Sequence, residues 1–143
     1  MIRKYQNSDS KKVLEIWEKA STLAHPFLSE DFVHKVKNDM NEIYLPMAET
    51  WVFEEDKNLT GFISMIGNEI GGLFVLPGNQ SKGTGTNLVN FILDLHDELE
   101  VEVFEQNIIG RSFYKKYGFL KIKEYVHQET NQVLIRMKYS KIE

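Results

Sequence analysis

The clearest chemical signal in this sequence is a short glycine-containing segment, Gln80-Ser81-Lys82-Gly83-Thr84-Gly85, between a predicted strand and a predicted helix. Glycine lets the backbone approach a ligand closely and turn consecutive N–H groups toward it. The positive end of the following helix adds to this effect, so the segment suits a pyrophosphate group. Its spacing is neither a Walker loop nor a complete Rossmann fingerprint, because position 88 is leucine where a third glycine is needed. The segment alone indicates either phosphate binding or a plain connection.

Metal and thiol chemistry find little support in the sequence. His34, His96 and His127 have no spacing typical of a metal site, and the lone His25 is either structural or functional. The chain has no cysteine, which excludes disulfides, thiolate nucleophiles and cysteine-based zinc sites. We therefore expect chemistry without a metal.

Length and composition predict one domain that spans residues 1–143. The apolar share of 42% and the charged share of 27% are typical of a soluble globular protein. The formal net charge of −4 argues against a surface that neutralises phosphates, so we expect no nucleic-acid partner. No apolar run approaches the roughly 20 residues that cross a bilayer, and the opening residues lack a signal-peptide core. The expectation is a cytoplasmic protein with no membrane segment.

Hydrophobic periodicity predicts the elements that position these residues. After a short strand, Ser8 or Asp9 begins a helix, which ends at His25-Pro26-Phe27 because proline disfavours a helical residue before it. A second helix is predicted from Ser29. Its apolar face is expected to carry Phe32, Val36, Met40, Ile43 and Met47.

The second half of the chain alternates between strands and helices. Strands are predicted at 51–53, 61–66, 72–76, 101–104, 119–126 and 133–139, and helices after the glycine segment and at 108–117. Gly118 is a natural left-handed cap for the last helix. The strand, helix and strand around the glycine segment imply a right-handed crossover and hence one parallel pair of strands.

Two blocks in this order resemble the signature of the GNAT N-acetyltransferase superfamily. Val75-Leu76-Pro77 followed by the glycine segment matches an apolar strand, a proline and then Gln/Arg-x-x-Gly-x-Gly/Ala. The second block is Asn107 in a strand-to-helix turn, then Phe113-Tyr114 and Gly118-Phe119. The resemblance covers essentially the whole chain. It implies the GNAT fold, an α/β (α+β) architecture with a mixed, mostly antiparallel sheet of about seven strands, a central parallel pair and about four helices.

The resemblance also implies acetyl-coenzyme A as the acetyl donor. The loop amides would hold its pyrophosphate, and its pantetheine arm would lie between the two parallel strands. The sequence departs from the commonest family pattern in having Gln80 rather than arginine and Thr84 rather than an aliphatic residue. The coenzyme-binding residues implied in this way are Phe74, Val75, Gln80, Ser81, Lys82, Gly83, Thr84, Gly85, Thr86, Asn107 and Tyr114.

Two catalytic residues are implied by the same resemblance. Tyr114 matches the family's usual general acid, which returns a proton to the departing thiolate; otherwise it is a packing residue beside Phe113. Glu102 alternates with two valines, so its side chain faces away from theirs. It is either the general base, as in the ribosomal-protein N-acetyltransferases of this superfamily, or an ordinary strand carboxylate. Glu69 and Glu105 are the alternative bases.

The acceptor is expected to be a primary amine on a protein lysine, a peptide N-terminus or a small molecule. In this superfamily the region between the first two helices lines the acceptor pocket, which suggests His25 and Phe27 as substrate-binding residues. Several segments, among them His25-Pro26-Phe27 and Trp51-Val52-Phe53, resemble short bacterial peptidyl-lysine acetyltransferases. The alternative is a non-catalytic acyl-coenzyme A sensor of the same fold. A monomer and a homodimer are both compatible with the sequence.

Overall fold

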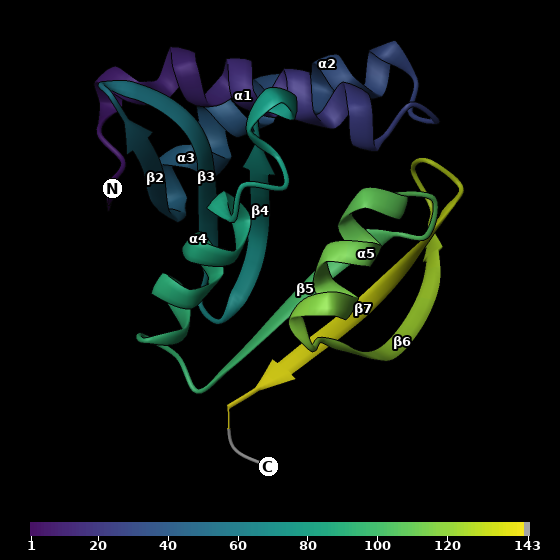
Figure 1. Ribbon diagram of the computed structural model, residues 1–143. Helices are drawn as coiled ribbons and strands as arrows, with labels where there is room; N and C mark the ends of the chain where they lie inside the picture. Colours follow the sequence, from purple (N-terminus) through teal and green to yellow (C-terminus); the bar gives the residue numbers. More distant parts are fainter. Residues whose placement is uncertain (142–143) are drawn as a thin grey trace.

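A seven-stranded sheet in the order β1-β2-β3-β4-β5-β7-β6 forms the centre of this computed structural model, which describes residues 1–141 (Figure 1). Residues 142 and 143, which the predicted domain includes, lie outside the described part. All neighbouring strands run antiparallel except β4 and β5, which are parallel, so the predicted fold class is confirmed. The strands are β1 (Ile2–Lys4), β2 (Glu49–Glu55), β3 (Asn58–Ile66), β4 (Glu69–Val75), β5 (Glu98–Phe104), β6 (Leu120–His127) and β7 (Gln132–Ser140).

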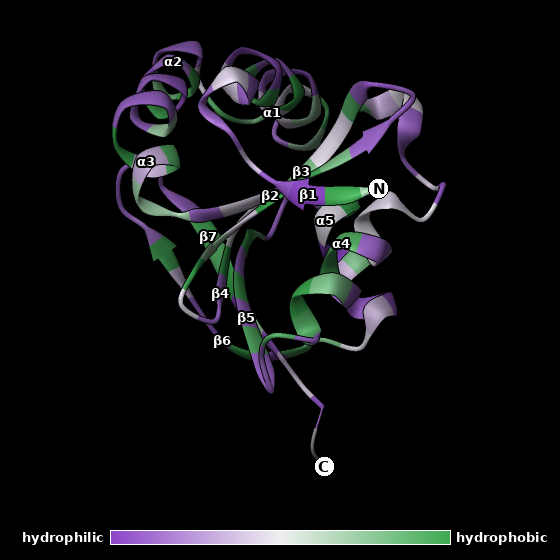
Figure 2. Cartoon of the chain, turned by 90° about the vertical axis from the view of Figure 1, so that its left-hand side faces the viewer, coloured by the Kyte–Doolittle hydropathy of each residue, from purple (hydrophilic) through white to green (hydrophobic). Residues whose placement is uncertain are grey.

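The helices lie in two layers, with α1 and α2 on one face of the sheet and α4 and α5 on the other (Figure 2). No helix in the described part of the chain is long and apolar enough to cross a membrane. The helices are α1 (Ser10–Ala24), α2 (Glu30–Asp39), α3 (Leu45–Met47), α4 (Thr84–Leu93) and α5 (Ile108–Tyr117), with a π-helix at Met40–Tyr44 and 3₁₀ turns at Asn7–Asp9 and Pro77–Asn79.

Alternation along β3 builds a separate hydrophobic core on each face of the sheet. Phe62 packs with Val13 and Ile16 of α1, and Ile63 packs with Leu88 and other apolar residues of α4. All five side chains are fully buried. Burying one such side chain contributes roughly 1.5–3 kcal/mol, so the two cores fix both helical layers to the central strands.

The parallel strands β4 and β5 separate soon after they meet. Only two residue pairs are in register, Glu69 with Glu100 and Ile70 with Val101. On its other edge β4 carries a β-bulge against β3, which leaves Gly71 between the two registered pairs there. A bulge bends its strand and increases the local twist. From Gly71 onward, β4 and β5 therefore diverge, and the sheet opens near its middle.

The segment after α2 differs from the single continuous helix that periodicity predicts. The π-helix takes more residues per turn than an α-helix, so it changes which side chains face the sheet. Ile43 and Met47 are exposed, at 59% and 66%, whereas Leu45 is buried and Tyr44 is half-buried. The predicted apolar face is therefore correct as far as Met40 and wrong for Ile43 and Met47.

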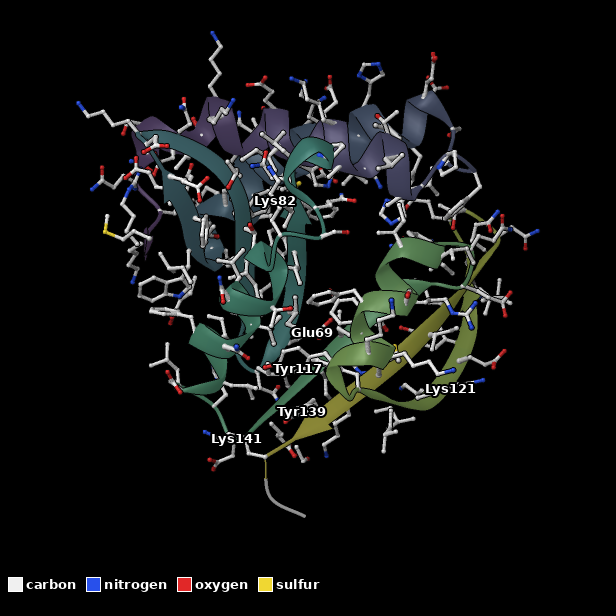
Figure 3. The ribbon with its side chains drawn as sticks, in the orientation of Figure 1. Glu69, Lys82, Tyr117, Lys121, Tyr139 and Lys141 are labelled. Atoms are coloured by element: carbon white, nitrogen blue, oxygen red, sulfur yellow. The ribbon has the colours of Figure 1, made fainter. Side chains whose placement is uncertain are left out.

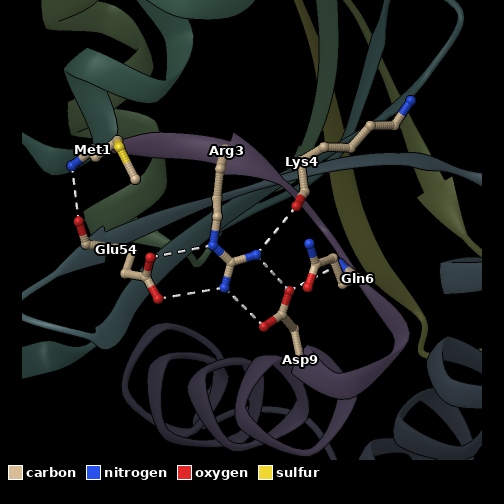
Figure 4. A network of polar contacts seen from close by, with 6 residues as sticks. All are labelled: Met1, Arg3, Lys4, Gln6, Asp9 and Glu54. Carbon is tan, nitrogen blue, oxygen red and sulfur yellow. Dashed lines mark hydrogen bonds and ion pairs between the residues drawn. The ribbon is translucent and has the colours of Figure 1, made fainter.

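An arginine at the edge of the sheet anchors the start of α1 (Figure 4). Arg3 donates two hydrogen bonds to Asp9, at 2.9 and 3.0 Å, and two to Glu54, at 3.2 and 3.4 Å. Asp9 also accepts the backbone N–H of Gln6. The Arg3 guanidinium holds the pKa of the Asp9 carboxyl below its usual range, despite burial. This ion pair ties β1 and β2 to the turn from which α1 begins.

Candidate active site

A cavity of about 390 Å³ lies beside the glycine segment, between the end of β4, the start of α4 and one side of α5. Gly83 precedes α4 in a left-handed conformation, with φ of +86°. Nothing lies within 4 Å of a Cβ added there, so glycine is needed for the backbone conformation rather than for space. A Cβ on Gly85 would approach the Phe113 ring to 3.2 Å, which shows how closely α4 and α5 pack. We call this space the loop cavity.

The loop cavity collects most of the residues predicted to bind the coenzyme. The side chain of Gln80 donates to the Val75 carbonyl at 3.1 Å and so ties the loop to the end of β4. Four predicted residues do not line this cavity: Lys82 is exposed on the loop (Figure 3), Thr84 is buried, and Phe74 and Asn107 face the opposite side of the sheet. Those that line it are Val75, Gln80, Ser81, Gly83, Gly85, Thr86 and Tyr114.

A second cavity of about 300 Å³ lies on the other face, between the sheet and the layer of α1, α2 and the π-helix. Its walls are mostly apolar, and Glu102 is the one acidic or basic side chain among its lining residues apart from His25. We call this space the helix cavity. Leu73, Gly110 and Tyr114 line both cavities. The two cavities therefore approach each other from opposite faces, through the opening between β4 and β5.

Tyr114 stands at this junction. It projects from α5, is 6% exposed, and packs its ring against Phe113 and Phe119. Burial raises the pKa of the Tyr114 hydroxyl above its ordinary value near 10. The hydroxyl therefore remains protonated at neutral pH. Its place at the junction, rather than its acidity, is what brings it within reach of a group bound between the cavities.

Glu102 lies on the sheet face opposite to its neighbours Val101 and Val103, as strand alternation predicts. Its carboxylate is 3.3 Å from Arg136 Nη1 of β7. The same guanidinium binds Glu100 at 2.7 Å and Glu69 at 3.1 Å, so three carboxylates share one arginine. Of the alternative bases, Glu69 lies at the start of β4 (Figure 3) and Glu105 is exposed; neither lines the helix cavity.

His25 follows α1 and lines the helix cavity. Its ring nitrogens lie 3.0 Å from Ser21 Oγ and 3.2 Å from Asn107 Nδ2. Burial lowers the pKa of the imidazole to about 4. The side chain of Asn107, which the family resemblance implies as a coenzyme-binding residue, caps α5 and contacts His25. Phe27 lines neither cavity; its ring packs against His25 and Phe104.

Sequence reasoning missed two polar residues at this site. Arg136 alternates with the buried Ile135 and Met137 in a predicted strand, so its side chain is predicted on the opposite face of the sheet. Its ion pairs with β4 and β5 join segments distant in the sequence, and no local pattern predicts them. Tyr44 lines the helix cavity because the π-helix turns it inward. Its hydroxyl is buried with no hydrogen-bond partner in the described part of the chain.

The loop cavity has the features that the pyrophosphate of a coenzyme requires. The left-handed Gly83 starts a ten-residue helix, so the first N–H groups of α4 lack partners within the helix and are available to an anion. The cavity continues past Val75 and Leu73 to the opening between the strands, which gives an extended arm a path to Tyr114. Within residues 1–141, no group of three or more histidine or acidic residues is arranged to hold a metal ion.

Known proteins match the chain along most of its length. Residues 9–141 match the family described as Acetyltransferase (GNAT) domain. The peptidyl-lysine N-acetyltransferase YiaC of Escherichia coli (strain K12) is 33% identical over 120 residues, which are 83% of this chain and 82% of YiaC. The peptidyl-lysine N-acetyltransferase YjaB of Salmonella typhimurium is 32% identical over 119 residues, or 82% of this chain and 81% of that protein.

Solved structures are similar as well. The solution structure of the apo form of YjaB from Escherichia coli has a TM-score of 0.87 and 28% identity, covering 97% of this chain and 96% of that one. The PaiA N-acetyltransferase from Thermoplasma acidophilum, solved in complex with coenzyme A, has a TM-score of 0.78 and 22% identity, covering 97% and 98%. The chain belongs to the GNAT acetyltransferase family, and it is an N-acetyltransferase that uses acetyl-coenzyme A.

Proposed function

We propose that this enzyme acetylates a primary amine on a protein or peptide, with a lysine side chain as the first candidate. The observation that carries the proposal is the meeting of the two cavities at Tyr114, Leu73 and Gly110. A donor held in the loop cavity and an amine entering through the helix cavity reach the same point from opposite faces of the sheet. The names of the relatives YiaC and YjaB, both peptidyl-lysine N-acetyltransferases, support a peptide or protein acceptor.

In this proposal, residues of the loop and of β4 hold the donor. The backbone N–H groups from Ser81 to Thr86 bind its pyrophosphate, and backbone groups of β4 near Phe74 and Val75 pair with its extended arm. Acetyl-coenzyme A supplies a thioester, whose carbonyl carbon is attacked by the amine. A backbone N–H of β4 beyond Ile70, where β5 no longer pairs with the strand, donates to the carbonyl oxygen.

Two side chains move the protons. As the new N–C bond forms, the amine gives up a proton to Glu102, directly or through a water molecule. As the C–S bond breaks, Tyr114 donates its hydroxyl proton to the departing sulfur. Both residues line the helix cavity, and Tyr114 also reaches the loop cavity, so the base lies on the acceptor side and the acid between the two sides. The products are an acetylated amide and a free thiol.

The test measures free-thiol release from acetyl-coenzyme A with a panel of acceptors. The panel contains lysine peptides, peptides with a free N-terminus and small amines, and mass spectrometry locates the acetyl group. We expect the highest kcat/KM with lysine peptides. Release no faster than hydrolysis with every acceptor, together with tight coenzyme binding, would contradict catalysis and would favour an acyl-coenzyme A sensor.

A further inference from the structure

A line of polar contacts joins the end of α1 to the beginning of α5 across the helix cavity. Ser21 of α1 contacts Nδ1 of His25 at 3.0 Å, and Nε2 of His25 is 3.2 Å from Nδ2 of Asn107. The Oδ1 atom of Asn107 accepts the backbone N–H of Gly110, in the first turn of α5, at 2.9 Å. Ser21 and Asn107 are 3% and 8% exposed. Little of these two side chains is therefore open to bulk solvent, and water competes weakly for their contacts.

The chemistry of these groups permits one arrangement of protons. The backbone N–H of Gly110 can only donate, so the oxygen of the Asn107 amide must face it and the NH₂ group must face His25. An NH₂ group can only donate, so His25 Nε2 must be the unprotonated, accepting nitrogen. The single ring proton is then on Nδ1 and points to Ser21 Oγ. One backbone N–H thus selects the neutral Nδ1–H form of the imidazole.

Gly110 is needed for this contact to exist. A Cβ added at Gly110 would come within 2.5 Å of Asn107 Nδ2 and 3.2 Å of the Val103 side chain. A larger residue would therefore push the amide away from His25. Gly110 lines both cavities, and Tyr114 follows it by one helical turn on the same side of α5.

We propose that His25 is a positioning residue for acetyl transfer, which acts through Asn107 to fix the first turn of α5 and hence the position of Tyr114. The inference rests on the proposed function, because it assigns Tyr114 to the reaction. His25 accepts from Asn107 and holds the amide in place against Gly110, and it also fixes the end of α1 against α5. It thereby fixes the position of Tyr114, the proton donor, relative to the α1 wall of the helix cavity. This role differs from the direct substrate contact that the sequence suggests for His25.

Two substitutions at His25 separate this role from simple packing. The ring packs edge-on against Phe104 and Phe27, with centroids 5.4 and 5.8 Å away. His25→Phe keeps that aromatic packing and removes the acceptor. His25→Gln removes the ring but places a carbonyl oxygen at about the reach of Nε2, where it can accept from Asn107. Positioning through Asn107 predicts that the Gln variant is the more active one, and packing predicts the reverse.

The experiment measures kcat, acceptor KM and coenzyme A Kd for the parent and both variants, with the best acceptor of the panel. We expect His25→Phe to lower kcat at least tenfold, His25→Gln to lower it less than threefold, and both to leave the coenzyme A Kd unchanged, since the loop cavity does not include residue 25. His127→Phe is the matched control. Its ring packs on the same Phe104, but it contacts Thr130 and lines neither cavity, so kcat should not change.

Three results would overturn the inference. A kcat for His25→Phe equal to or above that of His25→Gln would make His25 a packing residue. A tenfold rise in acceptor KM at constant kcat in the His25 variants would show that His25 contacts the substrate directly. Nitrogen-15 NMR of the imidazole, which requires no activity, would overturn it by finding the proton on Nε2. If the parent enzyme releases no thiol with any amine, the result contradicts the proposed function itself and the role of Tyr114 in it, rather than the role of His25 alone.

Discussion

The hydroxyl of Tyr44 occupies the space that a side chain at Gly71 would fill: a Cβ added to Gly71 would overlap that oxygen. Gly71 is the bulge residue at which β4 leaves β5, so the tyrosine reaches the opening of the sheet because the strand has no side chain there. Burial and the negative charge of Glu69 raise the pKa of Tyr44 to about 12. Its hydroxyl is buried and neutral, and it has no hydrogen-bond partner within residues 1–141.

Replacing Tyr44 with phenylalanine should therefore not destabilise the fold. A buried hydroxyl without a partner costs roughly 1–3 kcal/mol, and part of this cost is recovered when the oxygen is removed. We expect Tyr44→Phe to leave the free energy of unfolding in urea unchanged or to raise it by up to about 1 kcal/mol. Thr50→Val is the contrasting variant, because it breaks the buried Thr50–Ser64 hydrogen bond of 2.7 Å and should lower stability. A large loss in Tyr44→Phe would reveal a partner for the hydroxyl.

Tyr114→Phe should lower kcat by roughly 10²-fold or more while leaving the fold and the coenzyme A Kd intact, because a positioned acid contributes about that factor. The rate of thiol release gives kcat, and calorimetry gives the coenzyme A Kd. Tyr117→Phe is the matched control on the same helix: its hydroxyl bonds Asn90, and it lines neither cavity. Parent-like turnover in Tyr114→Phe would make Tyr114 a packing residue.

Glu102→Gln should remove the acidic limb of the profile of kcat/KM against pH. An ammonium group cannot attack a thioester, so a base matters most below the acceptor's own pKa, which is about 10 for lysine. The control is Glu100→Gln, which also removes a carboxylate from Arg136 but lies outside the helix cavity. Identical profiles for the parent and Glu102→Gln would show that the amine arrives neutral or that Glu69 or Glu105 acts as the base.

Gly83→Val should weaken coenzyme A binding by more than about tenfold, or 1.4 kcal/mol. The φ of +86° is strained for any L-residue and most of all for a β-branched one, so the loop must change its path and the amides their direction. Gly78→Val is the control, since Gly78 lacks a positive φ and has open space around its Cβ position. Calorimetry that finds equal Kd values for Gly83→Val and the parent would place the pyrophosphate elsewhere.

Acid should destabilise the protein through His25. The folded pKa of about 4 lies below the ordinary imidazole value of 6.5, so the unfolded chain binds more protons between these values, and stability falls as pH is lowered from about 6.5 toward 4. The difference amounts to about 2 kcal/mol by pH 5. Urea titrations should therefore show that the free energy of unfolding falls less between pH 7 and pH 5 in His25→Phe than in the parent. Equal losses would mean that His25 is not buried as a neutral ring; His34→Gln, at an exposed position, is the control.

The sequence by itself predicts the elements whose boundaries depend on local chemistry. The helix at 108–117 has these bounds in the structure, because Asn107 accepts the N–H of Gly110 at its start and Gly118 adopts φ of +120° at its end. The glycine segment likewise leads into α4, which begins within it at Thr84, directly after Gly83 in the conformation that only glycine adopts easily. Both signals lie within a few residues of the feature that they determine.

Only the tertiary structure decides features that depend on contacts between distant residues. No local pattern in the sequence predicts the π-helix. Because of it, Tyr44 rather than Ile43 lines the helix cavity. The proton on His25 is set by the side-chain amide of Asn107, 82 residues away, which the backbone N–H of Gly110 orients. The opening between β4 and β5 arises because a bulge against a third strand bends β4. Periodicity and spacing describe one segment at a time, whereas these features arise from how packed segments constrain one another.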